Sequence, residues 1–271
     1  MAIVIRAARL SNLLDLLRAQ GVVSTTQLAD ELGVSVVTIR RDLDVLAEEG
    51  YVERVFGGAR LWPDATLPIT VETMGETETV DEPFEQVLAR NSEGKKRIAR
   101  RAASLVEDGE TVFLDVGTTC HELARSLTDR TITVITASLS AVDLLSRAPG
   151  VDLVLLGGEY NREYRCTQGS TVSDALSALQ VDRAFLGCAG ISDRALIRDT
   201  DTRQVAVKRA AIRVAGTTAV LVDASKLPGT GAFIAGDVTD LDHLITDADL
   251  DTAAPALAEL LAHASTEVLT P

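Results

Sequence analysis

Apolar residues in the first fifty positions recur at the spacing of three short helices. The first stripe ends before Gly21 and consists of four leucines, Leu10, Leu13, Leu14 and Leu17. Residues 24–27 form a capping-box pattern that opens a second helix. Gly33 supplies a turn, and Ser35 can cap a third helix. The buried stripe of this third helix is Ile39, Leu43 and Leu46. Two short helices joined by a tight turn are typical of a helix-turn-helix.

The third helix carries side chains that suit contact with DNA near its N-terminal end. Val37 and Arg41 lie on the face opposite the buried stripe, Thr38 and Arg40 lie on its flanks, and Ser35 precedes the helix. A recognition helix places this end against base edges. Methyl groups contact thymine methyls, whereas an arginine pairs with guanine or binds a phosphate. The sequence leaves open which arginine has which role.

Residues 51–61 have the pattern of a β-hairpin, which would form the wing of a winged helix-turn-helix. Alternating residues precede a turn at Gly57 and Gly58, and a second strand follows. Arg54 and Arg60 lie at the base of this hairpin and suit contact with phosphate or the minor groove. The alternative is a small packing module whose arginines form a solvated face.

Helices and short apolar strands alternate from residue 94 onward. The predicted strands are 111–116, 133–135, 151–156, 183–186, 218–222 and 243–245. The predicted helices are 139–147, 172–179, 204–214 and 252–262. This order predicts an α/β fold with a Rossmann-like domain, in which helices cover both faces of a mostly parallel sheet. Ligands in such domains bind at the carboxyl ends of the strands.

Small and polar residues follow the predicted strands, as expected where a ligand approaches the backbone. They are Gly117, Thr118, Thr119, Thr136, Ala137, Ser138, Gly157, Gly158, Gly187, Ala189, Gly190 and the run 223–226, which ends in Lys226. A glycine, two hydroxyl groups and a helix start at 117–119 together make an anion cradle. Alone, this triplet could be only a capped helix start, but five such loops favour a ligand site.

Charge and composition divide the chain into residues 1–62, an acidic linker at 63–92, and residues 93–271. The net charge is −14, of which −1, −6 and −7 fall on these three segments, so the total does not exclude DNA as a partner. The linker holds Pro63, Pro68 and Pro83, and its end at 84–90 can form a short helix. The simplest interpretation of the linker is a solvated tether between the two domains.

The remaining features exclude several classes of protein. Three widely spaced cysteines predict neither a disulfide framework nor a zinc site, and we expect no cofactor. We find no signal peptide and no apolar run of about 20 residues, the length that spans a bilayer. We therefore expect a cytoplasmic protein.

Two sets of motifs resemble the DeoR family of transcription repressors. The first is Thr-Ile-Arg-Arg-Asp-Leu at 38–43, followed by Leu46, Gly50, Arg54 and Gly-Gly-Ala at 57–59. The second comprises 96–99, 115–119, 157–158, 207–209 and 223–226. The resemblance implies a repressor of a carbohydrate-use operon. Its C-terminal sensor domain, related to ribose-5-phosphate isomerase, would release operator DNA on binding a phosphorylated sugar or polyol.

The resemblance also implies roles for individual residues. Residues 117–119 would hold the effector phosphate, and Asp115 with the 136–138 loop would meet its hydroxyl groups. Lys208 and Lys226 would complement its charge, although Lys208 on a helix could equally be solvated. The chain departs from the family pattern at Phe56, Ala137, Ala195 and Gln204. These departures leave the effector's identity open.

Two other functions compete with a sensor. A phosphosugar isomerase needs a carboxylate base beside the sugar, but residues 188–191 read Cys-Ala-Gly-Ile, so we expect no catalytic residue and no enzyme. A domain that served only for oligomerisation would have no reason for small polar strand-end loops. We still expect a homodimer or higher homo-oligomer, because one winged helix reads too few base pairs.

Overall fold

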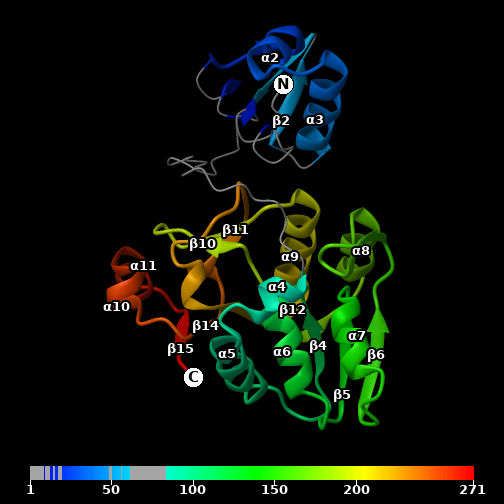
Figure 1. The fold of residues 1–271 in the computed structure, drawn as a ribbon, viewed down its shortest axis with the longest axis vertical. Coiled ribbons are helices and arrows are strands. Elements are labelled where there is room, and N and C mark those ends of the chain that lie inside the picture. Colours follow the sequence, from blue (N-terminus) through cyan, green and yellow to red (C-terminus); the bar gives the residue numbers. More distant parts are fainter. Residues whose placement is uncertain are drawn as a thin grey trace. The chain divides into compact units, whose positions relative to one another are not determined.

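The computed structural model describes residues 9, 13–14, 16–17, 20–48, 51–55, 57–61 and 84–271. The chain divides into two compact units, Met1–Thr77 and Glu78–Pro271 (Figure 1). In the described part of the chain, no helix is long and apolar enough to cross a membrane.

The N-terminal unit is a helix-turn-helix with a β-hairpin, as predicted. Its elements are β1 (Val23–Ser24), α2 (Thr25–Leu32), α3 (Val36–Glu48), β2 (Val52–Val55) and β3 (Gly58–Leu61). The three strands form an antiparallel sheet in the order β1-β3-β2. The buried apolar side chains include Leu13, Leu14, Leu17, Leu28, Ile39, Leu43 and Leu46. Leu10 and Gly50 lie outside the described residues.

Side-chain caps and a left-handed turn place the two helices. The Ser24 hydroxyl accepts a hydrogen bond from the backbone N–H of Gln27 at 3.1 Å, and Ser35 does the same for Thr38 at 3.1 Å. Between the helices, Gly33 has a φ of 65°, which a residue with a side chain rarely adopts. The sequence therefore fixes this turn locally.

Close backbone contact explains the second glycine of the hairpin. A Cβ atom at Gly58 would lie 2.2 Å from the carbonyl oxygen of Val23. The Thr25 backbone N–H and hydroxyl donate to the Gly57 carbonyl at 2.8 and 3.0 Å. These contacts fasten the hairpin to the start of α2.

The C-terminal unit is built on a seven-stranded sheet in which every neighbouring pair is parallel. Its order is β15-β14-β12-β9-β4-β5-β6. The strands are β4 (Thr111–Leu114), β5 (Ile132–Thr136), β6 (Val151–Leu155), β9 (Val181–Leu186), β12 (Ala215–Val222), β14 (His243–Thr246) and β15 (Glu267–Leu269). The predicted parallel α/β architecture is confirmed.

The strand order reverses between β4 and β9. From β4 the chain proceeds through β5 to β6, and from β9 it proceeds the other way through β12 to β14. Right-handed crossovers therefore place the helices of the two halves on opposite faces. The helices are α4 (Phe84–Ala89), α5 (Ser92–Ala103), α6 (Thr118–Ser126), α7 (Leu139–Leu145), α8 (Ser170–Ser177), α9 (Thr202–Val214), α10 (Leu250–Ala253) and α11 (Pro255–Leu261).

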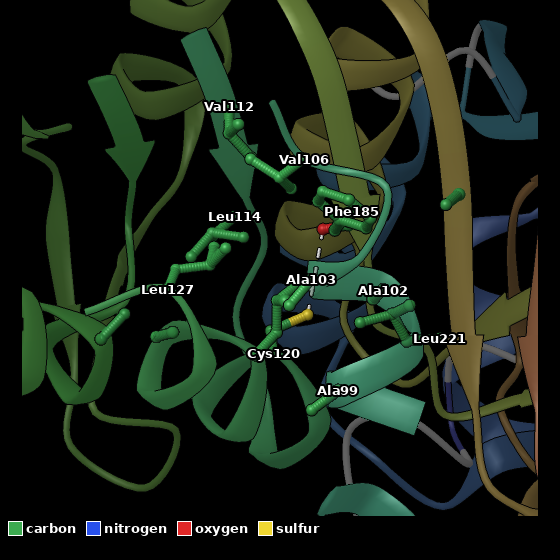
Figure 2. Close-up of a cluster of buried hydrophobic side chains, with 14 of the residues drawn as sticks. Ala99, Ala102, Ala103, Val106, Val112, Leu114, Cys120, Leu127, Phe185 and Leu221 are labelled. Carbon is green, nitrogen blue, oxygen red and sulfur yellow. Dashed lines mark hydrogen bonds between the residues drawn. The ribbon is translucent and has the colours of Figure 1, made fainter. Parts of the chain in front are cut away.

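Small residues bring α5 and α6 close to the sheet. Figure 2 shows Ala99, Ala102 and Ala103 of α5 with Cys120 of α6, whose thiol lies 3.9 Å from the Phe185 carbonyl oxygen. The strands add Val112, Leu114, Phe185 and Leu221, all buried. Such packing of small side chains against branched ones gives a dense core with few aromatic residues.

Several short strands were not predicted. They are β1 of the N-terminal unit, β15 at the edge of the parallel sheet, β7 (Glu159–Asn161) and β8 (Cys166–Gln168), which form a hairpin, and β10 (Gly190–Ile191), β11 (Leu196–Asp199) and β13 (Phe233–Asp237), which form an antiparallel sheet. Segments of two to five residues carry too little alternation to be distinguished from loops. The predicted helix at 252–262 is divided into α10 and α11 before Pro255.

Candidate functional site

A cavity of about 200 Å³ opens at the point where the strand order reverses. Its walls include the loop after β4, at 116–120, and the loop after β9, at 187–189. Ligands of open α/β sheets bind at this position, outside the carboxyl ends of the strands. The cavity therefore lies where the fold directs a ligand.

The start of α6 supplies groups for an anion. Gly117 has a φ of 114° and precedes the helix, and no side chain caps the first turn. The first backbone N–H groups of a helix have no intrahelical partner and attract negative charge. Among the described residues, the buried hydroxyl of Thr118 has no hydrogen-bond partner. Gly117, Thr118 and Thr119 all line the cavity, as predicted.

Lys208 and Asp199, which line the cavity, form a buried ion cluster with Asp115, which does not. The Nζ atom of Lys208, on α9, lies 2.9 Å from Oδ2 of Asp115 and 2.9 Å from Oδ2 of Asp199. The backbone N–H of Gly187 also donates to Oδ2 of Asp115, at 3.0 Å. Oδ1 of Asp115 is buried and has no partner among the described residues. Lys208 is thus held by protein carboxylates.

Burial and charge act against each other within this cluster. Burial disfavours the charge on Lys208, but Asp115 and Asp199 outweigh it and raise the pKa of Lys208 above its ordinary value. Burial raises the pKa of Asp115, and Lys208 opposes that rise. Lys208 is therefore an ammonium throughout the physiological pH range.

Lys226 lies on the 3-10 turn that follows β12 (Ala224–Lys226). Its ammonium donates to the carbonyl oxygen of Cys188, and the side chain lines the cavity. Among the described residues, no carboxylate lies at ion-pair distance from Lys226, and its side chain is only half-buried. Lys226 is thus better placed than Lys208 to meet a phosphate.

Sequence reasoning missed the residues that complete the cavity. They are Phe84 and Val87 of α4, Glu163 and Tyr164 of the β7–β8 hairpin, Asp199, Thr200, Gln204 and Thr230. Gln204 was noted only as a departure from the family pattern. The others lie on short elements that carry no periodic signal, apart from the helix predicted at 84–90, which is confirmed as α4. For Phe84 and Val87, the signal that could have indicated a cavity wall was the presence of aromatic and apolar side chains in that predicted helix.

Seven predicted effector residues do not line the cavity: Asp115, Thr136, Ala137, Ser138, Gly157, Gly158 and Gly190. The Thr136 hydroxyl donates to the Leu114 carbonyl at 2.7 Å, and Ser138 caps α7. The Ala137 carbonyl accepts from the Thr167 N–H at 2.9 Å. In the structure these three residues fasten strands and the β7–β8 hairpin to one another, and their predicted effector role stays a prediction. Gly187 and Ala189 do line the cavity.

The N-terminal part of α3 presents the side chains that were predicted to read DNA. Val37 is 57% exposed, and Arg40 and Arg41 are exposed without an ion-pair partner among the described residues. The Thr38 hydroxyl lies 2.8 Å from that of Ser35. Asp42 turns inward instead and pairs with Arg9 at 2.6 Å.

The arginines of the hairpin both have acidic neighbours. Arg54 lies 3.6 Å from Asp44, and Arg60 lies 2.7 Å from Glu53 on the opposing strand. Both are partly exposed pairs, which solvent screens. Their predicted DNA contact would exchange these pairs for phosphates. Phe56, at the hairpin turn, lies outside the described residues.

Metal binding has no basis in the described part of the chain. No group of three or more histidine, cysteine or acidic side chains there is placed to hold a metal ion. Burial raises the pKa of Cys166 and Cys188 to about 11, so both thiols stay protonated.

Comparison with known proteins identifies both units. Residues 9–63 match the DeoR-like helix-turn-helix domain, and residues 90–248 match the DeoR C terminal sensor domain. The HTH-type transcriptional repressor GlcR of Bacillus subtilis is 37% identical over 88% of this chain and 87% of its own length. The glycerol-3-phosphate regulon repressor of Escherichia coli is 30% identical over 89% and 90%.

One further relative is an activator, and one solved structure shares part of the fold. The L-fucose operon activator of Escherichia coli is 29% identical over 89% of this chain and 95% of its own. Ribose 5-phosphate isomerase A of Methanocaldococcus jannaschii is 23% identical, with a TM-score of 0.38 over 50% of this chain and 54% of its own, a likeness too low to support an argument. The two domain matches and the full-length relatives are sufficient: this chain belongs to the DeoR family of DNA-binding transcription regulators.

Proposed function

We propose that this chain represses a carbohydrate-use operon and leaves its operator when a phosphorylated sugar or polyol fills the C-terminal cavity. Two relatives support this: a glycerol-3-phosphate regulon repressor and, in Lactococcus lactis, a lactose phosphotransferase system repressor. As a regulator of bacterial DNA, the chain would act in the cytoplasm.

The observation that carries the proposal is an unsatisfied polar atom in the lining of the cavity: the buried Thr118 hydroxyl, at the uncapped start of α6, suits an anion. Oδ1 of Asp115, which pairs with Lys208 of the lining, also has no partner among the described residues. Buried polar atoms are rarely left without a partner. Ligand pockets are commonly about 300–1,000 Å³, so a smaller cavity favours a small ligand such as a monosaccharide or polyol phosphate.

The charges around the cavity favour a defined orientation of this ligand. The phosphate would lie against the first turn of α6, within reach of Lys226, because both supply positive charge. Hydroxyl groups would face Asp199 and Thr200, which line the cavity. Asp115 would act on the ligand through Lys208, which it holds in place.

We also propose that the protein binds the phosphosugar without converting it into another compound. Asp115 is outside the cavity lining and is paired with an ammonium and a backbone N–H, so it is not placed to take a proton from the ligand. Gln204, an amide, stands at the cavity wall and cannot transfer a proton. We expect a bound phosphosugar to be recovered unchanged after prolonged incubation, as followed by NMR.

Operator recognition would use two copies of α3. Val37, Thr38, Arg40 and Arg41 present apolar and cationic groups at the end of the helix that enters the major groove. A homodimer or higher homo-oligomer would place two such helices on half-sites one helical turn, about 34–36 Å, apart. Effector and operator would then oppose each other reciprocally, since each lowers affinity for the other by the same factor.

The test is thermal melting of the full-length protein against phosphorylated sugars and polyols, with their unphosphorylated parents as controls. At 100 times its dissociation constant, a ligand stabilises the native state by about 2.7 kcal/mol. A raised melting midpoint with one phosphorylated compound, and none with its parent, supports the proposal. No shift with any compound of the panel contradicts it, while leaving DNA binding intact.

A further inference from the structure

Helix α4 joins the linker side of the chain to the wall of the cavity. It spans Phe84–Ala89, packs on α6 (Figure 1), and follows residues 62–83 directly in sequence. Phe84 and Val87 both line the cavity. A ligand in the cavity would therefore touch the helix to which the linker is attached.

The two ends of α4 are held by different kinds of contact. At its C-terminal end, the ammonium of Lys95 donates to the carbonyl oxygens of Val87 and of Arg90, the latter at 2.7 Å. Lys95 is only 2% exposed, and the described residues give it no carboxylate partner at ion-pair distance. A buried cation bound to helix carbonyls is costly to release, because it would be left unsatisfied.

At the N-terminal end, the Phe84 ring contacts one aromatic ring and one cationic group. Its ring meets that of His121 edge to face, with centroids 5.6 Å apart. The guanidinium of Arg165 lies 6.0 Å from the Phe84 centroid and pairs with Glu85 at 3.5 Å. These Arg165 contacts are partly exposed, so each is weak in water.

Arg165 also contacts α7 and directly follows a residue that lines the cavity. It sits in the β7–β8 hairpin with a φ of 50°, an unusual conformation for a residue other than glycine. Its guanidinium also pairs with Asp143 of α7, and its carbonyl accepts from the Leu139 N–H at 2.9 Å. The preceding residue, Tyr164, lines the cavity. One residue thus connects the hairpin, α4 and α7.

We propose that α4 senses occupancy of the cavity, and that Arg165 is a positioning residue that latches its linker end through Phe84 and Glu85. The Lys95 contacts hold the C-terminal end of α4 as a pivot, and a ligand displaces Phe84 and releases the weaker latch. The response to the ligand rests on the proposed effector function, whereas the latch itself exists without a ligand.

The latch is tested by hydrogen–deuterium exchange of the full-length protein without ligand. Arg165→Met should raise exchange of peptides covering 84–90 about tenfold, because the linker end of α4 is no longer held. Arg165→Lys, which keeps the charge, should restore part of the protection. Arg162→Met is the matched control, since Arg162 is an exposed arginine of the same hairpin and contacts none of these groups. Equal exchange in Arg165→Met and wild type overturns the latch.

The sensing role is tested with sn-glycerol 3-phosphate, D-glucose 6-phosphate and D-ribose 5-phosphate, each titrated by calorimetry and then used for exchange at saturation. In the wild type, the probe that binds should raise exchange at 84–90 at least threefold. In Arg165→Met the same probe should bind within threefold of wild type but leave that exchange nearly unchanged, a split that a merely structural role does not give. A probe that binds the wild type without changing exchange at 84–90 overturns the sensing role alone. Failure of every probe to bind removes the proposed effector and the sensing role together.

Discussion

Lys208 and Asp115 form a buried ion pair, 2.9 Å between Nζ and Oδ2, with exposed side-chain fractions of 2% and 0%. Asp199 shares the same ammonium at 2.9 Å. The pair joins α9 to the carboxyl end of β4, across the place where the strand order reverses. It therefore fixes the geometry of the cavity and stabilises the domain that contains it.

Lys208→Met should lower the free energy of unfolding of the C-terminal unit by about 3–5 kcal/mol, the usual cost of leaving a buried charge without its partner. Two carboxylates would then face each other without a cation. Urea denaturation measures the loss. Lys226→Met is the control, because Lys226 is half-buried and its removal leaves no carboxylate without a partner among the described residues. A loss in Lys208→Met no larger than in Lys226→Met would show that the carboxylates are solvated or protonated.

Replacing Thr118 and Thr119 together by valine should abolish binding of the phosphorylated effector while leaving operator affinity unchanged. The substitution keeps the volume of the side chains and removes both hydroxyl groups from the start of α6. Calorimetry with the compound identified by melting measures the loss. Thr136→Val is the matched control: its hydroxyl bonds the Leu114 carbonyl outside the cavity, so stability should fall while affinity persists. Persistent binding by the double variant would place the phosphate elsewhere.

Arg41→Ala should weaken operator binding by about 1–3 kcal/mol if the guanidinium pairs with a base. Arg41 is exposed on α3, and no described acidic residue competes for it. A gel-shift titration against DNA selected from a random pool supplies the measurement. Arg162→Ala, which removes the same charge from the C-terminal unit, controls for net charge. An operator affinity equal to that of the wild type would show that Arg41 does not pair with a base.

The N-terminal unit could be predicted well because its signals are local. The Ser24 cap, the Gly33 turn and the leucine stripes each act within a few residues, and each appears as expected. The parallel sheet was also predicted, because its buried strands read as apolar runs between helices. In contrast, β10, β11 and β13 are stabilised by pairing with each other, and their own sequences are too short to indicate it.

Only those parts of the candidate site whose signal lies within a few consecutive residues could be predicted. The run 117–119 is visible in sequence as a small-residue loop before a helix. Lys208 was expected either to be solvated or to meet the effector, since its carboxylate partners come from residues 115 and 199, far away in sequence. The contribution of Phe84 could not be predicted for the same reason: its neighbours His121 and Arg165 are brought to it by folding.

Lys95 should make the stability of the C-terminal unit depend on pH. Burial lowers the pKa of Lys95 from its ordinary value to about 8, with Asp223 opposing that shift and Lys226 and Arg90 adding to it. Between about pH 8 and the ordinary lysine value near 10.4, the unfolded chain binds a proton that the folded chain lacks. Stability contributed by this residue therefore rises with pH over that interval, by about 3 kcal/mol in all.

Urea denaturation at pH 7, 8, 9 and 10 measures this effect as the difference between wild type and Lys95→Met. The variant removes the titrating group, so the wild-type free energy of unfolding should gain on that of the variant as pH rises from 8 to 10. Lys96→Met is the matched control, because Lys96 is an exposed neighbour on the same helix, paired with Glu93 at 2.7 Å. Its difference from wild type should stay flat. A wild-type curve parallel to that of Lys95→Met would mean that the Lys95 ammonium is solvated in the native state, and that the pivot at Val87 and Arg90 is not a buried one.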